Sequence, residues 1–292
     1  MFKVSICIPT YNRKDYLKEA LESVFAQTYK DYEVVIVDDG SADGTEEMIK
    51  DNGYNVRYYW QENKGVAVAT NKLIELAKGQ FISFLDSDDL LMPDTIGRLI
   101  DVVTSEPKDI IAYGSYLRID QNGNVCGMCK RKLYSGYITK YLFQSIFVHS
   151  CGSMFPKRAL EKIGAFDESL PACFDYDLWL RLSLKYPFVA LSKPTFKRRR
   201  HPGNLSRTSL ANRIAELRVL ERFYHEKGGN KAVTHRAAMR RLSKEEYRVG
   251  TCAARGGDYD VARRFLTKSF RRYPNIKSAL RWGQVASKQL IA

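Results

Sequence analysis

The chain has 292 residues, of which 45% are hydrophobic and 12% aromatic, as in ordinary globular proteins with one large domain or two smaller ones. No apolar run reaches the roughly 18 residues that a membrane-spanning helix needs. The apolar stretch at the N-terminus is also too short for a signal peptide and lacks its cleavage site, so we expect a cytoplasmic protein.

The formal net charge of +14 is concentrated at the C-terminal end. Residues 197–292 contain 24 Lys and Arg against 7 Asp and Glu, a net charge of +17, whereas residues 1–196 contain 23 against 26, a net charge of −3. Only the C-terminal region therefore favours an anionic partner.

The first hundred residues alternate between apolar runs of strand length and amphipathic runs of helix length. The expected order is a strand at 3–8, a helix after residue 13, a strand at 33–38, a helix at 43–51, a strand at 55–60, a helix at 65–77 and a strand at 81–85. This β-α-β-α-β-α-β order predicts an α/β fold with a parallel, doubly wound sheet. Ligands of such sheets bind beyond the carboxyl ends of the strands, where we expect Tyr11, Asp39 and Asp88 to share one crevice.

The alternation breaks after a helix at 93–103. The expected elements that follow are antiparallel strands at 110–119 and 124–134 joined by a turn at 121–123, a helix at 137–145, a strand at 151–155, a helix from residue 175 and an extended segment at 188–199. Beyond residue 208 the pattern is helical and basic. It includes one helix pair within 245–272, similar to a single tetratricopeptide hairpin, although a solenoid needs about three repeats.

Three carboxylates follow the apolar run 81–85, at Asp86, Asp88 and Asp89. Carboxylates crowded beyond a buried strand repel one another unless a cation or a donor-rich ligand binds them. Their hard oxygen atoms suit Mg²⁺ or Mn²⁺ bound together with phosphate groups. The alternative is that Asp88 or Asp89 only caps the helix that starts near residue 93.

Six cysteines are scattered along the chain, and only Cys126 and Cys129 form a CxxC pair. A single pair cannot complete a four-ligand zinc site. We therefore expect reduced, structural thiols.

Five motifs in order resemble glycosyltransferase family 2, whose members are inverting enzymes with the GT-A fold that use nucleotide-diphosphate sugars. The motifs are IPTYNR at 8–13, VDDGS at 37–41, NKG at 63–65, LDSDD at 85–89 and DYDLWLR at 175–181. The resemblance covers residues 3–207. It implies a catalytic domain at 1–207, with a nucleotide-sugar-binding half at 1–105 and an acceptor-binding half at 106–207, followed by a basic helical region at 208–292.

The resemblance also implies which residues bind the donor and a divalent cation, Mn²⁺ or Mg²⁺. The nucleotide-sugar-binding residues would be Pro9, Thr10, Tyr11, Asp39, Asn63, Gly65 and Asp86. Tyr11 would contact the nucleobase ring, and the Asp39 carboxylate would accept one of its N–H groups. Asp88 and His201 would bind the metal, which neutralises the departing diphosphate. The plainer alternatives are a packed loop aromatic at Tyr11, a turn-former at Asp39 and a solvated loop histidine.

By the same resemblance Asp175 is the candidate general base, which takes the proton of the attacking acceptor hydroxyl in one inverting displacement. Asp177 and Trp179 would contact the acceptor, and Asp177 competes for the role of base. Asp175 could alternatively only cap the helix that follows it. Two residues depart from the family pattern, because Phe174 stands where many relatives have Glu and Thr70 stands where many have Arg.

The function expected from the resemblance is transfer of a sugar, from UDP by preference, to a glycan or lipid-linked acceptor in cell-surface polysaccharide or glycolipid biosynthesis. Arg198 to Arg200 and Arg207 could contact the diphosphate or form a solvated basic face. One alternative is a sugar nucleotidyltransferase with a GT-A-like fold, but the segment 10–13 lacks the glycines usual there. Another is a nucleic-acid-binding protein, but no aromatic platform accompanies the charge, so we expect no nucleic acid.

The segment 211–223 places five apolar residues largely along one side of a helix, with arginines flanking that side: Ile214, Leu217, Val219, Leu220 and Phe223. A structural helix would bury this side in the protein. The alternative is that the basic C-terminal region docks on an anionic membrane, holding the enzyme near a lipid-linked acceptor at the inner face of the cell membrane.

Overall fold

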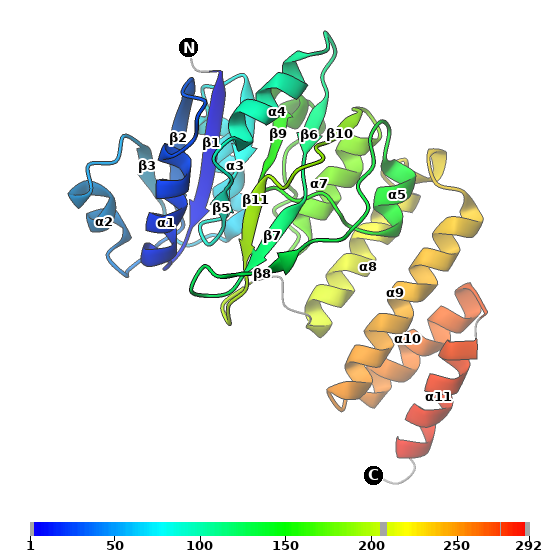
Figure 1. Ribbon diagram of the computed structural model, residues 1–292. Helices are drawn as coiled ribbons and strands as arrows, with labels where there is room; N and C mark the ends of the chain where they lie inside the picture. The colour runs from blue at the N-terminus through cyan, green and yellow to red at the C-terminus, as the bar shows by residue number, and fades with distance from the viewer. Residues whose placement is uncertain (1–2, 205–208, 275, 290–292) are drawn as a thin grey trace. The chain divides into compact units, whose positions relative to one another are not determined.

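The computed structural model describes residues 3–204, 209–274 and 276–289, and it divides into two compact units (Figure 1). The first unit consists of Met1–Ile138, Phe147–Glu168 and Lys185–Gly203. The second unit consists of Thr139–Ile146, Ser169–Leu184 and Asn204–Ala292.

A seven-stranded sheet forms the centre of the first unit, in the strand order β10-β6-β9-β4-β1-β2-β3. Along the chain these strands are β1 (Val4–Thr10), β2 (Tyr32–Asp38), β3 (Arg57–Trp60), β4 (Phe81–Phe84), β6 (Ile111–Tyr113), β9 (Ser153–Pro156) and β10 (Phe188–Ala190). Strands β1 to β4 run parallel to their neighbours among the four, and only β9 is antiparallel to both of its neighbours. The predicted α/β class with a mostly parallel sheet is therefore confirmed.

The two faces of β1 bury different residues because side chains alternate along a strand. Ile6 and Ile8 point into a core with the apolar sides of α1 (Lys14–Phe25), α2 (Thr45–Asp51) and α4 (Thr95–Thr104). Cys7 points to the other face, where its thiol lies 3.9 Å from the Leu73 carbonyl oxygen of α3 (Val66–Leu76). Each fully buried Ile or Leu side chain contributes about 1.5–3 kcal/mol. This double burial fixes β1 in the middle of the sheet.

A smaller, four-stranded sheet has the order β5-β11-β7-β8. Its strands are β5 (Leu90–Leu91), β7 (Tyr116–Ile119), β8 (Val125–Met128) and β11 (Phe196–Arg199). The predicted hairpin at 121–123 joins β7 to β8 and is confirmed. The predicted strand at 110–119 is in fact two strands in different sheets, β6 and β7. The chain bends between them at Gly114, where a Cβ atom would lie only 2.4 Å from the Thr195 side chain.

Two further differences from the expected elements lie in the second half of the chain. A short helix, α6 (Lys157–Ile163), follows β9 and was not predicted, because only Ala159 and Leu160 among its residues mark a buried side. The extended segment at 188–199 is divided into β10 and β11, which belong to different sheets. Local sequence predicts extended backbone but does not show which sheet a strand joins.

The second unit is helical. It contains α5 (Thr139–Gln144), α7 (Phe174–Ser183), α8 (Leu210–His225), a 3₁₀ turn at Gly229–Lys231, α9 (His235–Arg255), α10 (Tyr259–Arg272) and α11 (Ile276–Gln289). From α8 onward each α-helix packs on the next (Figure 1). The predicted helix hairpin is confirmed as α9 and α10, with Gly257 at a φ of 85° between them. In the described part of the chain, no helix has the length and apolarity to cross a membrane.

The division into units differs from the predicted boundary at residue 207. Helices α5 and α7, expected in the acceptor-binding half, belong to the unit that contains α8 to α11. The Tyr176 hydroxyl of α7 donates to the Leu142 carbonyl oxygen of α5 at 2.8 Å, and the Phe143 ring of α5 packs on Phe223 of α8. Helices α8 and α9 thus complete the core around α5 and α7, and they are not an appendage.

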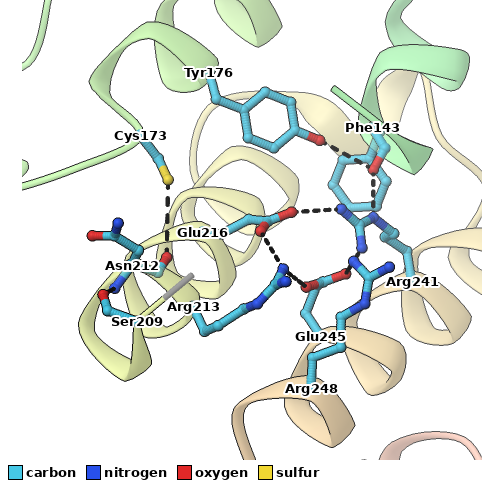
Figure 2. Close-up of polar contacts among 10 residues, drawn as sticks. All are labelled: Phe143, Cys173, Tyr176, Ser209, Asn212, Arg213, Glu216, Arg241, Glu245 and Arg248. Atoms are coloured by element: carbon cyan, nitrogen blue, oxygen red, sulfur yellow. Dashed lines mark hydrogen bonds and ion pairs between the residues drawn. The ribbon is translucent and has the colours of Figure 1, made fainter. Parts of the chain in front are cut away.

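Buried charges join the same helices (Figure 2). Arg241 of α9 is almost fully buried, and it donates to the Phe143 carbonyl oxygen at 3.0 Å and to the Glu216 carboxylate of α8 at 2.9 Å. Arg241 also pairs with Glu245, which is contacted by Arg248 at 2.6 Å. Removing one member of a buried ion pair typically costs about 3–5 kcal/mol, because the other charge stays buried without its partner.

We predict that the chain cut after residue 207 loses cooperative folding, because α5 and α7 would lose their apolar and charged partners on α8 and α9. Thermal unfolding followed by near- and far-ultraviolet circular dichroism measures this. A matched chain cut after residue 257 retains α8 and α9, and we expect it to unfold cooperatively at a moderately lower Tm. Cooperative unfolding of the shorter chain at the full-length Tm would show that α8 and α9 are dispensable for the fold.

Candidate functional site

The carboxyl ends of β1 and β2 are joined by their loops. The backbone N–H of Asp39 donates to the Thr10 carbonyl oxygen at 2.9 Å. Asn12, at a φ of 49°, receives the Ala42 N–H on its side-chain oxygen at 2.9 Å and donates its own N–H to the Ser41 hydroxyl at 2.8 Å. The left-handed region is tolerated by Asn, whose short polar side chain hydrogen-bonds locally. The two motifs at 8–13 and 37–41 therefore form one rigid edge.

Asp39 is buried at this edge, and its carboxylate has three donors. It accepts from the Gln61 amide at 2.8 Å, from the Lys64 N–H at 2.9 Å and from the Gly65 N–H at 2.8 Å. A carboxylate offers about four lone-pair sites, so one remains for a donor on a ligand. Asp39 is thus more than a turn-former, since it also holds the loop that starts α3.

The remaining residues expected to bind the donor surround Asp39. Tyr11 is 48% exposed, so its ring presents an open apolar surface rather than a packed loop aromatic. Asn63 is exposed and Pro9 is half-buried. Within the described chain the buried Thr10 hydroxyl has no hydrogen-bond partner. Gly40 has a φ of 91°, and a Cβ atom there would lie 3.0 Å from the Asn63 nitrogen. This close approach explains the glycine in the motif.

The three carboxylates after β4 have different environments. Asp86 is exposed, whereas Asp88 and Asp89 are buried. The Asp89 carboxylate accepts the backbone N–H of Arg199 at 2.9 Å. Burial, followed by the neighbouring charges of Asp86 and Asp88, raises the pKa of Asp89 well above its ordinary value. Asp89 therefore anchors β11, and Asp86 and Asp88 are the carboxylates that remain for a ligand.

Asp88 lies between two cationic or ligating groups. Its Oδ2 atom is 2.7 Å from an Arg13 guanidinium nitrogen and 2.8 Å from Nε2 of His201. The Gly203 N–H donates to Nδ1 of His201 at 3.1 Å, which places the ring proton on Nε2, facing Asp88. His201 is therefore a positioned side chain rather than a solvated loop residue. The residue before α4 is Asp94, whose side chain makes no cap hydrogen bond. Neither Asp88 nor Asp89 is therefore the cap residue of this helix.

This arrangement has the donor chemistry of a divalent-cation site. A carboxylate oxygen and an imidazole nitrogen converge, and both are ligand types that Mn²⁺ accepts. A cation at Nε2 would require the ring proton to lie on Nδ1, in place of the Gly203 N–H contact. Among the described residues, no group of three His, Cys, Asp or Glu side chains could hold a metal ion by itself. Two protein ligands completed by phosphate oxygens and water is the usual pattern for Mg²⁺ at nucleotide sites. The residues present fit a cation that binds together with a diphosphate.

Arg199 was expected to contact the diphosphate or solvent, and this expectation is wrong. Its guanidinium is buried and donates to the Asp88 carbonyl oxygen at 3.0 Å, the Gln121 carbonyl oxygen at 2.9 Å and the Glu19 carboxylate at 2.6 Å. It also lies over the Tyr16 ring. Each of the three guanidinium nitrogens makes one of these bonds and the group is shielded from solvent, so Arg199 positions the Asp88 backbone instead.

The neighbouring arginines have separate environments. Arg198 is partly buried with its guanidinium over the Tyr116 ring, and Arg200 is exposed. Arg207 lies outside the described residues. Sequence reasoning assigned no role to Arg13, although it follows the first strand within a motif and so lies at the ligand edge. The buried Arg199–Glu19 pair joins residues 180 positions apart, and no local pattern indicates it.

Asp175 lies in the first turn of α7 in the second unit and is half-buried. Its carboxylate accepts the adjacent Tyr176 N–H at 2.8 Å. The N-cap residue of α7 is Cys173, at a φ of 59°, so the alternative that Asp175 is the cap residue is wrong. A carboxylate in a first turn is still favoured by the helix dipole, which makes ionised Asp175 more stable.

Asp177 and Trp179 were expected to contact the acceptor, and the structure corrects both expectations. Asp177 is buried, and its two carboxylate oxygens are each 2.7 Å from a cation, Arg181 on one side and Lys227 on the other. The Trp179 side chain is fully buried. An acceptor cannot reach side chains that the protein covers, so both residues stabilise α7.

Residues 70 and 71 fix the start of the segment after α6. The Asn71 amide donates to the Phe166 carbonyl oxygen at 3.0 Å and accepts the Phe166 N–H at 2.9 Å. Thr70 is buried, with its hydroxyl bonded to the Val66 carbonyl oxygen at 2.6 Å. Thr70 therefore cannot supply the guanidinium contact that an arginine would make. The CxxC residues Cys126 and Cys129 are free thiols.

His149 is a partly exposed titratable residue close to β11, and its ring is largely shielded from solvent. Its ring contacts Tyr116 edge-on at 5.0 Å between centroids, and its Nε2 is shielded from solvent without a hydrogen-bond partner within the described chain. Burial, followed by the positive charges of Arg198, Arg131 and Arg200, lowers the pKa of His149 to about 3. The folded protein therefore holds this imidazole neutral.

The sequence is similar to a family model and to several known proteins. The model of the family described as Glycosyl transferase family 2 matches residues 5–164. Uncharacterized glycosyltransferase RT0329 of Rickettsia typhi is 35% identical over 224 residues, which cover 74% of this chain and 70% of that protein. Uncharacterized glycosyltransferase RC0461 of Rickettsia conorii is 35% identical over 76% of this chain, and the match spans 38% of its length. Chondroitin synthase of Escherichia coli is 34% identical over 70% of this chain and 30% of that protein.

Two solved structures share the fold. The crystal structure of S. aureus TarS 1–349 in complex with UDP-GlcNAc has a TM-score of 0.68 and 16% identity, over 99% of this chain and 91% of that chain. The mannosyltransferase PcManGT from Pyrobaculum calidifontis, in complex with GDP-Man and Mn²⁺, has a TM-score of 0.57 and 17% identity, over 96% of this chain and 86% of that chain. At these identities the likeness concerns the fold.

We predict that His149 makes folding stability fall at acid pH. The unfolded histidine titrates near pH 6.5 and the folded one near 3, so the stability present above 6.5 is lost as the pH falls toward 3. Between pH 7 and pH 5 this amounts to about 1–2 kcal/mol after allowance for the partial exposure of the residue. Urea unfolding at both pH values measures it, with His149→Phe as the comparison. An equal loss in both proteins would assign the effect to other groups.

Proposed function

The chain belongs to glycosyltransferase family 2 and has the GT-A fold, and we propose that it moves a sugar from a UDP-sugar to a hydroxyl group with inversion at the anomeric carbon. The acceptor in this proposal is a glycan or a lipid-linked glycan of cell-surface polysaccharide or glycolipid biosynthesis. The chondroitin synthase relative supports a polysaccharide acceptor. A lipid-linked acceptor would bring the enzyme to a membrane, and the basic second unit supports peripheral contact with anionic lipid.

The observation that carries the proposal is the convergence of Asp88, His201 and Arg13 at the sheet edge that also presents Tyr11 and Asp39. The exposed Tyr11 ring suits stacking on a nucleobase, and the fourth lone-pair site of Asp39 suits a base N–H. Arg13 supplies a guanidinium that can bind a phosphate oxygen in two-point fashion. Together these groups match the three parts of a nucleoside diphosphate: base, ribose and phosphates.

A divalent cation would be held by Asp88 and His201, and when bound it would neutralise the diphosphate as it leaves. Asp86 is exposed beside them and suits a ribose hydroxyl or a water molecule. Arg13 compensates the Asp88 charge when no ligand is bound. Because Asp88 is buried and flanked by Arg13, His201 and the Arg199-anchored backbone, its carboxylate has one defined orientation.

In the proposed reaction Asp175 accepts the proton of the acceptor hydroxyl. The hydroxyl oxygen forms a bond to the anomeric carbon while the bond from that carbon to the diphosphate oxygen breaks, and the electron pair leaves with the nucleoside diphosphate. Of the two carboxylates Asp175 and Asp177, Asp177 suits this role less, since Arg181 and Lys227 already bind both of its oxygens and its side chain is buried.

We predict that Asp88→Asn abolishes transfer and removes the metal-dependent stabilisation by donor. An amide cannot replace the carboxylate as a cation ligand, and loss of leaving-group stabilisation of several kcal/mol corresponds to roughly a thousandfold in rate. A thermal-shift screen of UDP-, dTDP- and GDP-sugars with and without Mn²⁺, followed by donor hydrolysis, measures both. Asp101→Asn, an exposed carboxylate on α4, is the matched control. Full activity in EDTA would rule out the cation, and no shift with any donor would overturn the proposed function.

We predict that Asp175→Asn retains donor binding but lowers the transfer rate by roughly 10²–10⁴, because the amide is nearly isosteric and accepts no proton. Asp177→Asn should instead lower thermal stability, since the partly buried Lys227 ammonium and Arg181 guanidinium lose this buried counter-charge. Donor titration, kcat and Tm of the two variants separate these effects. The assignment of the base is wrong if Asp177→Asn loses turnover at full stability while Asp175→Asn stays active.

A further inference from the structure

The apolar side of α8 is not a membrane-facing surface. Leu217, Leu220 and Phe223 are buried in the second unit, so the structural role expected for this side is confirmed. Two arginines of the basic region are also engaged, since Arg213 and the buried Arg241 both pair with Glu216. A surface for an anionic partner therefore lies elsewhere in the basic region.

Helix α10 carries an exposed stripe of cations. Arg264, Lys268 and Arg271 follow the four- and three-residue spacing that places side chains on one side of a helix, and Arg263 adjoins Arg264. The opposite side, with Ala262 and Leu266, is buried in a small core. The stripe therefore faces away from the packed side of α10.

Most of this charge has no counter-charge. In the described part of the chain, Arg264, Lys268 and Arg271 form no ion pair, whereas Arg272 is held by Glu246 at 2.9 Å and Glu221 at 2.6 Å. Arg263 has only a long contact of 3.4 Å with the exposed Asp260. Residues 259–289 contain eight Lys and Arg against one Asp, a net charge of +7. Such a local excess attracts anions and repels other cations.

The same stripe borders a groove with an aromatic wall. A groove of about 420 Å³ is lined by the four cations of α10, by Asp260 and Thr267 of the same helix and by Trp282 of α11, which is 42% exposed. The four cations outnumber the one carboxylate, so the lining carries a net positive charge. The two helices also expose Phe270 at 45% and Leu280 at 65%. Cations beside an exposed Trp are typical of protein surfaces that bind at the interface of a bilayer. A soluble polyanion would need the cations but not the apolar side chains.

We propose that this groove, which we call the α10–α11 groove and define by Arg263, Arg264, Lys268, Arg271 and Trp282, binds the phosphate headgroups of anionic phospholipids in a bilayer. The guanidinium and ammonium groups bind phosphate oxygens by charge-assisted hydrogen bonds. Trp282 lies at headgroup level, where its ring is apolar and its N–H can donate to a headgroup. The inference assigns residues to the proposed membrane contact and so rests on the proposed function.

Vesicle sedimentation tests the groove directly with the full chain. The probes are vesicles of phosphatidylcholine alone and of phosphatidylcholine mixed with phosphatidylglycerol. Wild-type protein should sediment with the mixed vesicles at low salt, detach at high salt and ignore phosphatidylcholine alone. Each basic residue near an anionic surface contributes about fivefold, so the triple variant Arg264→Gln, Lys268→Gln, Arg271→Gln should partition about a hundredfold more weakly.

The matched control removes the same charge from the first unit. Lys18, Lys108 and Lys162 are exposed and form no ion pair within the described residues, so their replacement by Gln lowers the net charge equally. Retained sedimentation of this control, with loss in the α10 triple variant, supports the groove. Equal loss in both variants would show diffuse attraction to net charge and overturn the proposal. Absence of sedimentation by the wild-type protein would also overturn it.

Quenching by brominated phosphatidylcholine in the mixed vesicles separates lipid from other anions. The chain has three tryptophans, and quenching that disappears in Trp282→Phe places that ring in the interface. Unquenched Trp282, together with complete displacement from vesicles by inorganic polyphosphate, would show a site for soluble polyanions instead. Neither measurement needs a sugar donor, so a transferase without lipid affinity is distinguished from a lipid-binding chain without transferase activity.

Discussion

The parallel pairing of β1 with both β2 and β4 is the constraint on which the donor-binding half depends. Because β1 is buried on both faces and bonded on both edges, the three carboxyl ends lie in one row. Tyr11, Asp39 and Asp88 follow these ends, so their proximity is a consequence of strand register rather than of loop length. The hydrogen bonds of Asn12 and Asp39 then fix the loops that the strands bring together.

The buried carboxylates of Asp39, Asp88 and Asp177 are compensated in different ways, and this difference separates those that suit ligand binding from the one that is structural. Asp39 accepts neutral N–H groups and keeps capacity for one more. Asp88 faces Arg13, which suits a diphosphate, and His201, which suits a cation. Asp177 is bound by Arg181 and Lys227, both supplied by the second unit itself. Burial together with two cations makes a carboxylate structural, whereas a neutral or ligating neighbour leaves it available for chemistry.

The basic excess of the C-terminal region likewise consists of two populations. Arg241 is buried against Glu216 and Glu245, and it holds α5, α8 and α9 together (Figure 2). Arg264, Lys268 and Arg271 of α10 are exposed and form no ion pair among the residues that the structure describes. A net charge summed along the sequence cannot separate these populations, because a buried ion pair and an unpaired surface cation count alike. Only the second population is available to bind an anion.

The sequence by itself determined the order of strands and helices from β1 to β4, the mostly parallel sheet and the residues at the strand ends, because these depend on local periodicity and on turn chemistry. It also indicated His201 through its motif, and the structure places this ring on Asp88. Only the tertiary structure decided that Arg199 is buried against Glu19, that Asp177 and Trp179 are covered, and that α5 and α7 belong with the C-terminal helices. These outcomes depend on which distant segments meet, and the partner of a charge or of an apolar face is set by packing across the chain rather than by its neighbours in sequence.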